Sequence, residues 1–390
     1  MTSTTGHRHW TVLAGCVLFG ASFNAYIIAP ASLVPRLVDA YAIDKPAAGL
    51  AISAVFLGWA LVQMPGGILT DRYDNRALVA VAVAVFVLAG FAGGLAPSYP
   101  TLLVSRVVGG GLGAFLWTTS TNIVNRVFPA DSRAIGTSIF AASAPVGVAV
   151  AQFLGPHVAD VVGWQAVFVL YPLAAVLGLP ILYAATEGAV RAEAQLSLGD
   201  FAVAVRNRGV LAVAVASFSA YSLFVFLNSW MPTYGIEQLG IGPALAGAAS
   251  AMVPVGGIIA RPGGGWLSDH LDRRRRPVVV ASLLVTLPVM WALSGVSVTL
   301  AFAALLLVAG VTVQSGIGIF YVYAAELAAD GTEGTALAVL TTVSTIGSLS
   351  APVVAGFLVA SVSWTAAFVF AAALALLGAG AVLLAPEPHA

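Results

Sequence analysis

The sequence contains little charge. Asp, Glu, Lys and Arg together make up 8% of its 390 residues, whereas roughly a quarter of an average soluble domain is charged. Hydrophobic residues make up 60%, and the mean hydropathy is +0.98. This composition excludes the soluble protein classes and predicts a chain that is embedded in a lipid bilayer.

The chain also has no net charge, a single cysteine and no metal-ligand cluster in its sequence. Sixteen basic residues balance sixteen acidic ones, so no bulk field points to a nucleic-acid partner. Cys16 is the single cysteine, which excludes an intrachain disulfide framework. No His, Cys, Asp and Glu cluster has metal-ligand spacing, and no nucleophile, base and acid are grouped as in a catalytic triad. We therefore expect no enzymatic activity, no metal and no cofactor.

Long apolar runs are abundant. Runs of about 20 residues match the length of a helix that crosses the hydrocarbon core. In lipid only helices and closed barrels satisfy the backbone, and runs of this length without alternation predict helices. The fold class that follows is an all-α membrane protein with twelve transmembrane helices. The predicted spans are 11–33, 47–69, 77–96, 100–121, 135–155, 164–184, 209–231, 243–268, 278–294, 297–321, 336–358 and 362–385.

Basic residues are unevenly distributed among the predicted loops. If both termini are cytoplasmic, twelve of the sixteen Lys and Arg residues fall in inner loops, and only Arg36 and Lys45 fall in outer loops. Cytoplasmic loops of membrane proteins carry this excess of positive charge. The distribution predicts a multi-pass protein of the plasma or inner membrane with both termini in the cytoplasm. The remaining two, Arg106 and Arg261, lie inside predicted spans.

The two halves of the sequence resemble each other at an offset close to half its length. The matched pairs are Gly67 and Gly265, Asp71 and Asp269 (offset 198), and Trp164 and Trp364, Phe168 and Phe368 (offset 200). Such matches predict a duplication. We expect an N-terminal six-helix half at 1–184, a cytoplasmic linker at 185–208 and a C-terminal six-helix half at 209–390. In transporters built from repeats, the substrate site lies near the midplane where the repeats meet.

The motifs within this repeat resemble those of a known family. Residues 67–76 (Gly-x-x-x-Asp-Arg-x-x-x-Arg) and 265–273 (Gly-x-x-x-Asp-x-x-x-Arg) resemble the loop signature of the major facilitator superfamily. Residues 106–113 (Arg-x-x-Gly-Gly-Gly-x-Gly) resemble its fourth-helix motif. The chain departs from the family pattern at Asp74, where glycine is usual, and at His270, where a base is usual. The resemblance implies the major facilitator fold, with two pseudo-symmetric six-helix halves.

The same resemblance implies alternating access. The halves would rock about a central cavity, and salt bridges between cytoplasmic loops would hold the outward-facing state. Each exposed pair of this kind contributes about 0 to 1 kcal/mol. The alternative is that these are ordinary topology charges and, for Arg106, that it bonds to the backbone of the first span. The predicted gating residues are Gly67, Asp71, Arg72, Arg76, Arg106, Arg126, Arg133, Gly265, Asp269, Arg273, Glu326 and Asp330.

Arg261 is the sharpest candidate for a binding residue. It lies eight residues before Asp269, about 12 Å into its helix at 1.5 Å per residue. A charge at this depth costs about 2.5 to 3.5 kcal/mol on insertion scales, so it should face a cavity. No Asp or Glu occurs inside any predicted span. Its guanidinium is suited to an anion, because it can donate two parallel hydrogen bonds to carboxylate or nitrate oxygens. The alternative is a structural arginine bonded to backbone carbonyls.

The context of Arg261, Ala-Arg-Pro-x-x-Gly, resembles the eighth helix of nitrate/nitrite porters and of monocarboxylate transporters. In those families the arginine holds the substrate anion. Nitrate porters carry a second arginine on the second helix. The repeat places Gln63 at the equivalent position of this chain. A single fixed positive charge suits a monovalent anion. Monocarboxylate transporters often have an acid on the first or eighth helix for proton coupling. The first span offers Asn24 instead, which favours uniport or exchange.

Further polar and aromatic residues would line the cavity in the superfamily arrangement. The alternative for each one is helix packing or an interfacial aromatic belt. The candidate substrate-binding residues are Arg261, Gln63, Asn24, Tyr221, Asn228, Gln314 and Trp117, with Tyr26, Thr118 and Tyr321 also expected at the cavity.

The sequence therefore predicts a secondary or facilitative transporter that moves a small monovalent anion, nitrate-like or a monocarboxylate, by alternating access. We expect it to act as a monomer in the bilayer. One alternative is an exporter of drugs or neutral solutes in which Arg261 is structural. Another is a membrane sensor that transports nothing.

Overall fold

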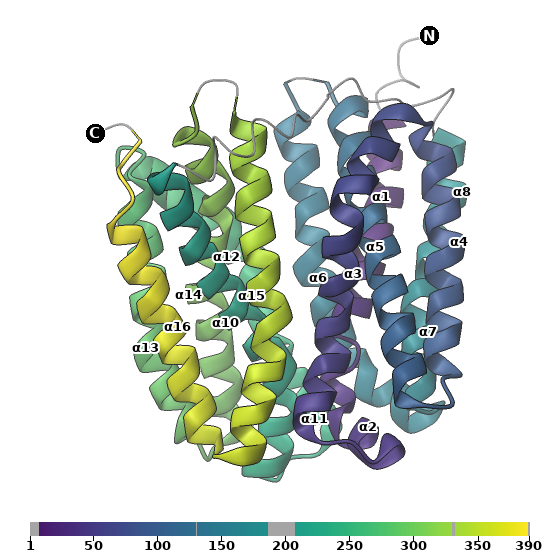
Figure 1. Cartoon of the computed structure of the whole chain (residues 1–390), viewed down its shortest axis with the longest axis vertical. Coiled ribbons are helices and arrows are strands. Elements are labelled where there is room, and N and C mark those ends of the chain that lie inside the picture. The colour runs from purple at the N-terminus through teal and green to yellow at the C-terminus, as the bar shows by residue number, and fades with distance from the viewer. Residues whose placement is uncertain (1–7, 130, 186–206, 330–331, 389–390) are drawn as a thin grey trace. The chain divides into compact units, whose positions relative to one another are not determined.

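The computed structural model of the chain describes residues 8–129, 131–185, 207–329 and 332–388. Every regular element in this part of the chain is helical, and twelve helical segments are long and apolar enough to cross a membrane (Figure 1). The predicted all-α class with twelve spans is thereby confirmed. Several helices continue past their apolar runs, as in α5 (Tyr99–Val127), because backbone hydrogen bonding does not stop where the hydrophobic residues end.

Contacts divide the chain into two compact units. Unit 1 comprises Met1–Tyr41 and Ala54–Gln195, and unit 2 comprises Ala42–Ser53 and Leu196–Ala390. Most of the predicted linker, residues 186–206, lies outside the described residues.

The helices follow in chain order. The first ten elements are α1 (Arg8–Ile28), η1 (Ala31–Leu33), α2 (Val34–Tyr41), α3 (Lys45–Arg72), α4 (Asn75–Gly94), α5 (Tyr99–Val127), α6 (Arg133–Val161), α7 (Trp164–Ala174), η2 (Ala175–Leu177) and α8 (Gly178–Ala185). The others are α10 (Arg208–Leu239), α11 (Pro243–Ser250), α12 (Met252–His270), α13 (Arg275–Ser294), α14 (Thr299–Glu326), α15 (Glu333–Ser361) and α16 (Trp364–Leu383).

One long helix forms the centre of each unit's packing. In unit 1, α1 packs against α5, α6, α7 and α8, and in unit 2, α10 packs against α14, α15 and α16. Phe19 and Phe23 of α1 are fully buried, as are Phe226 and Trp230 of α10. These helices are apolar on more than one face because neighbours cover them on several sides.

The break between α11 and α12 lies inside one predicted span. Pro254 has no backbone N–H and cannot donate to the carbonyl of Ser250, so the helical ladder is interrupted there. The helix resumes at Met252 and carries Arg261 on its continuation. The break therefore sets the start of the segment that positions the main candidate residue.

The duplication appears in the packing as well as in the sequence. In unit 1, a Cβ on Gly110 of α5 would overlap the carbonyl oxygen of Val55 on α3. In unit 2, a Cβ on Gly310 of α14 would overlap the carbonyl oxygen of Val253 on α12. Glycine at these points lets the two backbones touch, as at other small-residue interfaces in membranes. The pair α3 and α5 in unit 1 thus corresponds to the pair α12 and α14 in unit 2, at offsets of 198 and 200.

Candidate functional site

Arg261 of α12 is held by Gln314 of α14. Its Nε donates to Gln314 Oε1 at 3.1 Å. Gln314 is fully buried, and its Nε2 donates to the carbonyl of Val253 at 2.8 Å. Since the amide nitrogen is committed to that carbonyl, the amide oxygen is left to face the guanidinium. Gly257 makes room for this arrangement, because a Cβ there would overlap the Gln314 amide.

The other end of the Arg261 guanidinium meets no hydrogen-bond acceptor in the part of the chain that the structure describes. Its Nη1 and Nη2 donate no hydrogen bond within the described ranges, and no acidic side chain of those ranges forms an ion pair with it. The side chain is half-buried, and its Cζ lies 5.7 Å from the centroid of the Phe224 ring. This geometry leaves a fixed positive charge with parallel N–H donors that can meet an anion.

Two tyrosines complete the surroundings of this guanidinium. The hydroxyls of Tyr221 on α10 and Tyr321 on α14 lie 3.4 Å apart, and both phenols are close enough to Arg261 to interact electrostatically. The structure therefore brings four predicted residues together in unit 2: Arg261, Gln314, Tyr221 and Tyr321.

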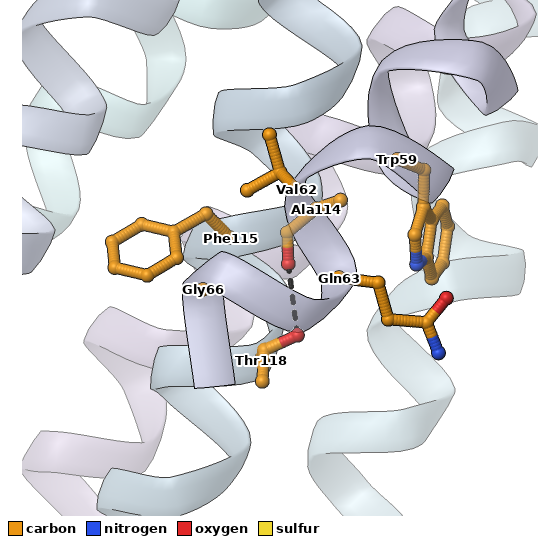
Figure 2. Close-up of a pocket in the computed structure, with 7 residues that line it drawn as sticks. All are labelled: Trp59, Val62, Gln63, Gly66, Ala114, Phe115 and Thr118. Atoms are coloured by element: carbon orange, nitrogen blue, oxygen red, sulfur yellow. Dashed lines mark hydrogen bonds between the residues drawn. The ribbon is translucent and has the colours of Figure 1, made fainter. Parts of the chain in front are cut away.

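The corresponding place in unit 1 is a small pocket between α3 and α5 (Figure 2). Its lining residues are Trp59, Val62, Gln63, Gly66, Ala114, Phe115 and Thr118. Gln63 occupies the repeat position of Arg261, and Ala114 that of Gln314. The same helix pair thus builds a charged site in one unit and an uncharged pocket in the other.

Three other predicted binding residues make contacts away from Arg261. Asn24 Nδ2 donates to the Gly20 carbonyl at 2.9 Å, and Asn228 Nδ2 donates to the Phe224 carbonyl at 2.7 Å, each within its own helix. The ring of Trp117 lies 4.5 Å from that of Phe140.

Arg106 of α5 is bound to the backbone of α1. It is fully buried, and its Nη1 and Nη2 donate to the carbonyls of Tyr26 and Ile27 at 2.6 and 2.7 Å. The ring of Tyr26 lies under the guanidinium at 4.3 Å, and the Tyr26 hydroxyl donates to Ser105. The expectation that Tyr26 lines the cavity is therefore wrong, because this side chain has no exposed surface.

A charged cluster at the start of α13 contains two of the predicted gating residues. Arg275 Nη1 donates to Asp269 Oδ1 at 2.6 Å and to Ser268 Oγ at 3.0 Å. Its Nε and Nη2 donate to the two carboxylate oxygens of Glu326 at 3.0 and 2.9 Å. Such a two-pronged arginine–carboxylate contact is the strongest form of the pair. Asp269 and Glu326 thus meet on Arg275, which motif spacing did not single out.

The predicted gating arginine of this loop, Arg273, is exposed and lies in a turn. Asp272 and Arg273 both have left-handed backbone, with φ of 55° and 59°. Asp71 and Asp269 differ by 198, whereas the starts of α4 at Asn75 and α13 at Arg275 differ by 200. The second loop is therefore two residues longer, and the extra turn brings Arg275 to the acids in place of Arg273. The change of offset was the signal that could have identified it.

Glu387, near the end of the described chain, was not predicted. Its carboxylate accepts from the backbone N–H groups of Arg275 and Arg276 at 3.0 and 3.2 Å. A carboxylate at the N-terminus of a helix is stabilised by the unpaired N–H groups and the helix dipole. It joins the C-terminal segment to the Arg275 cluster.

The other predicted gating residues are dispersed. Arg72, Arg126 and Arg133 are exposed, and a Cβ on Gly265 would meet no atom within 4 Å. Arg76 lies over the ring of Tyr183 at 4.6 Å, and the Tyr183 hydroxyl donates to the Arg76 carbonyl. Asp330, the surroundings of Gly67 and the side chain of Asp71 lie outside the described part of the structure.

Another ion pair of unit 2 lies at the start of α3. Lys45 Nζ lies 2.7 Å from Glu237 Oε2, and Trp364 Nε1 donates to the same oxygen at 3.2 Å. Gly356 of α15 allows the backbone of Lys45 to approach closely. In unit 1, Arg36 pairs with Asp160.

Comparison with known proteins identifies the family. Duplicated bundles of membrane-crossing helices define a class of secondary transporters. The sequence matches the Major Facilitator Superfamily over residues 14–329 and 271–390, and the chain belongs to this family. It is a multi-pass membrane transporter of small molecules and not an enzyme.

The chain is similar to transporters of different substrates. It is 28% identical to the 3-(3-hydroxy-phenyl)propionate transporter of Escherichia coli (strain K12) over 395 residues, which cover 97% of this chain and 94% of the relative. It is 23% identical to the nitrite extrusion protein of Bacillus subtilis (strain 168) over 259 residues, covering 65% and 64%. A D-xylose-proton symporter structure matches with a TM-score of 0.77 at 17% identity, covering 97% and 98%, which supports the fold alone.

Proposed function

We propose that the chain transports a small monovalent anion and that Arg261 binds it. The observation that carries this proposal is the state of the guanidinium: Nε is held by Gln314, while Nη1 and Nη2 donate to no acceptor in the described part of the protein. A structural arginine would be expected to use these donors on carbonyls, as Arg106 does. Two relatives are described by their names as carrying a carboxylate and nitrite, which are both monovalent oxyanions.

A single fixed charge favours a monovalent substrate. The repeat position of Arg261 in unit 1 is Gln63, which offers hydrogen bonds without charge. The two tyrosine hydroxyls share one hydrogen bond at 3.4 Å, which uses the proton of one of them, so the other hydroxyl can donate to a further oxygen of the anion. A second negative charge on the substrate would find no second fixed cation among the described groups around Arg261, which are Gln314, the two tyrosines and Phe224.

The experiment is uptake in proteoliposomes, with wild type compared with Arg261→Gln. The panel comprises nitrate, nitrite, formate, lactate, pyruvate, benzoate and oxalate. We expect uptake of one or more monovalent anions and a loss of about 10- to 100-fold in the variant, because charge-assisted hydrogen bonds contribute about 1.5–3 kcal/mol. Arg208→Gln, at an exposed arginine outside the predicted binding and gating residues, is the control and should transport normally. Normal uptake by Arg261→Gln, or no uptake of any anion by wild type, would contradict the proposal.

The coupling proposed is uniport or anion exchange. No Asp or Glu lies within the twelve apolar runs to carry a proton across, and the groups around Arg261 are an amide, two phenols and a phenyl ring. Uptake should therefore proceed without a pH gradient and be stimulated by a trans anion. A strict requirement for an inward proton gradient would contradict this mode.

We also propose that the Arg275 cluster is part of the cytoplasmic gate and that the protein acts as a monomer in the plasma or inner membrane. Supporting the gate is the meeting of Asp269, Arg275 and Glu326 from three different helices or their ends. Such ion pairs can break and re-form when helices shift.

A further inference from the structure

The two equivalent helix pairs begin with the same close backbone contact. In unit 1, a Cβ on Gly58 of α3 would overlap the carbonyl oxygen of Val107 on α5. In unit 2, a Cβ on Gly256 of α12 would lie 2.9 Å from the carbonyl oxygen of Leu307 on α14. These residues correspond at offsets of 198 and 200. Both pairs therefore start as small-residue interfaces.

Further along the helices, only unit 2 keeps its backbones in contact. A Cβ on Gly318 of α14 would overlap the carbonyl oxygen of Arg261 and would lie 3.0 Å from its Cα. Thr118 stands at the equivalent position of unit 1, and the nearby glycine of α3, Gly66, faces the ring of Phe115 instead of a backbone. All three of these residues line the pocket between α3 and α5 (Figure 2). A contact at Arg261 in unit 2 thus corresponds to an opening in unit 1.

Gly318 lies on the face of α14 that holds Arg261. It follows Gln314 by four residues and precedes Tyr321 by three, so these residues share one face of the helix. Gln314 Oε1 accepts from Arg261 Nε at 3.1 Å, and the Tyr321 phenol interacts with the same guanidinium electrostatically. This face therefore contacts Arg261 through an amide, through the backbone at Gly318 and through a phenol.

Gly264 supports the same contact from the opposite helix. It follows Arg261 by three residues on α12, and a Cβ there would overlap the carbonyl oxygen of Ser315, the residue after Gln314. The overlapped atoms at Gly264 and Gly318 both belong to the backbone, which cannot turn aside as the end of a side chain can. A methyl group at either glycine therefore requires α12 and α14 to separate beside Arg261.

We propose that Gly318 is a positioning residue for Arg261. By letting α12 touch α14, it sets how far the guanidinium lies from Gln314 and Tyr321, and so where Nη1 and Nη2 present their N–H groups. This inference rests on the proposed function, in which those N–H groups bind a monovalent anion. Two parallel hydrogen bonds to an anion depend on geometry, so a displaced guanidinium binds less tightly. Gly318 acts only through Arg261.

The test measures KM and kcat for uptake of nitrite and of benzoate by proteoliposomes. Gly318→Ala should raise the KM of the transported anion about tenfold and change kcat by less than about twofold, because a small displacement of a binding group weakens binding. The matched control is Gly110→Ala in unit 1, where the Cβ would also overlap a carbonyl oxygen, that of Val55. It should keep the wild-type KM. Thermal unfolding in detergent shows whether each variant folds.

Two further variants separate positioning from a general loss of packing. Gly264→Ala separates the same helices from the side of α12 and should raise KM as Gly318→Ala does, so it carries the test if Gly318→Ala does not fold. Adding Gly318→Ala to Arg261→Gln should lower kcat/KM by less than about twofold more, because substitutions that act through one group are not additive.

A wild-type KM in both Gly318→Ala and Gly264→Ala would overturn the positioning role. An equal rise of KM in Gly110→Ala, or the full tenfold loss on the Arg261→Gln background, would also overturn it. Failure of the proposed function is distinguishable. Uptake of neither anion, or normal uptake by Arg261→Gln, contradicts the proposed function and the positioning role together. Loss of uptake in Arg261→Gln with a wild-type KM in both glycine variants contradicts the positioning role alone.

Discussion

The two arginines inside the helices have opposite hydrogen-bonding states. Arg106 is fully buried and donates to two carbonyls of α1, which stabilise its charge inside unit 1. Arg261 is half-buried, and within the described residues its guanidinium is hydrogen-bonded through Nε alone, to Gln314. A charged group in a membrane helix is retained where it is paired or functional. The same residue type therefore supports α1 against α5 in unit 1 and is available to an anion in unit 2.

Gly257→Ala tests the support of Arg261 by Gln314. The new Cβ would overlap the Gln314 amide, which is the mobile end of a side chain, so the amide should move while the helices stay in place. We expect the KM for the transported anion to rise about tenfold, because a displaced charged group binds poorly, with little change in Tm.

Gly263→Ala is the control for that substitution. It lies on the same helix, and its Cβ would meet nothing within 4 Å. Both changes give a similar gain in helix propensity, so only the contact differs. Equal KM values in uptake assays of the two variants would show that Gln314 does not position Arg261.

At the scale of elements, the loop between α12 and α13 is where the two units differ most clearly. Two extra residues with left-handed backbone, Asp272 and Arg273, precede α13. Arg275, two residues after Arg273, binds Asp269 and Glu326. In unit 1 the equivalent helix start carries Asn75, which is buried and cannot form an ion pair. The cation that binds these acids at the start of α13 thus has no counterpart at Asn75.

Arg275→Gln should destabilise the protein. Removing this cation takes away the guanidinium that contacts the carboxylates of both Asp269 and Glu326. Breaking a fully buried pair costs about 3–5 kcal/mol, and because Asp269 is 61% exposed we expect a smaller loss, about 1–3 kcal/mol after solvent screening. Thermal unfolding in detergent should show a Tm several degrees lower. The neighbouring substitution Arg274→Gln, at an exposed position, should leave Tm unchanged. Equal Tm values for the two variants would show that the Arg275 cluster does not stabilise the protein.

At the scale of the whole molecule, the duplication and the distribution of charge make a prediction about orientation. Both termini should lie in the cytoplasm, because twelve of sixteen basic residues then fall in inner loops. Ser98 precedes α5 at one end of its helix, and Asp131 follows the other end. Both are exposed, whereas Cys16 is buried and can be replaced by serine as a background.

On that background, Ser98→Cys should react with a membrane-impermeant maleimide in intact cells. Asp131→Cys should react only after the cells are permeabilised, because the same helix carries it to the opposite side. Labelling of Asp131→Cys but not of Ser98→Cys in intact cells would show that the orientation is opposite to the predicted one. Labelling of both in intact cells would show that α5 does not cross the membrane.

Much of this architecture was readable from local patterns. Apolar runs of about 20 residues predict spans because the bilayer sets their length, and the twelve spans agree with the helices of the structure. Arg261 was identifiable because placing an arginine in an apolar run that holds no acid costs free energy in the bilayer. The correspondence of Gln63 with Arg261 followed from the offset of the repeat alone.

Other features depended on the tertiary structure. Hydropathy fixes where a helix lies along the chain but not its rotation about its axis, so Tyr26 was expected at a cavity and is fully buried under Arg106. Motif spacing pointed to Arg273, whereas a two-residue turn brings Arg275 to the acids. The hydrogen bond from Arg261 to Gln314 joins residues 53 positions apart. Sequence alone thus determined the spans, their duplication and the buried charge, because these follow from local polarity, and only the packing of helices decided which side chains that charge meets.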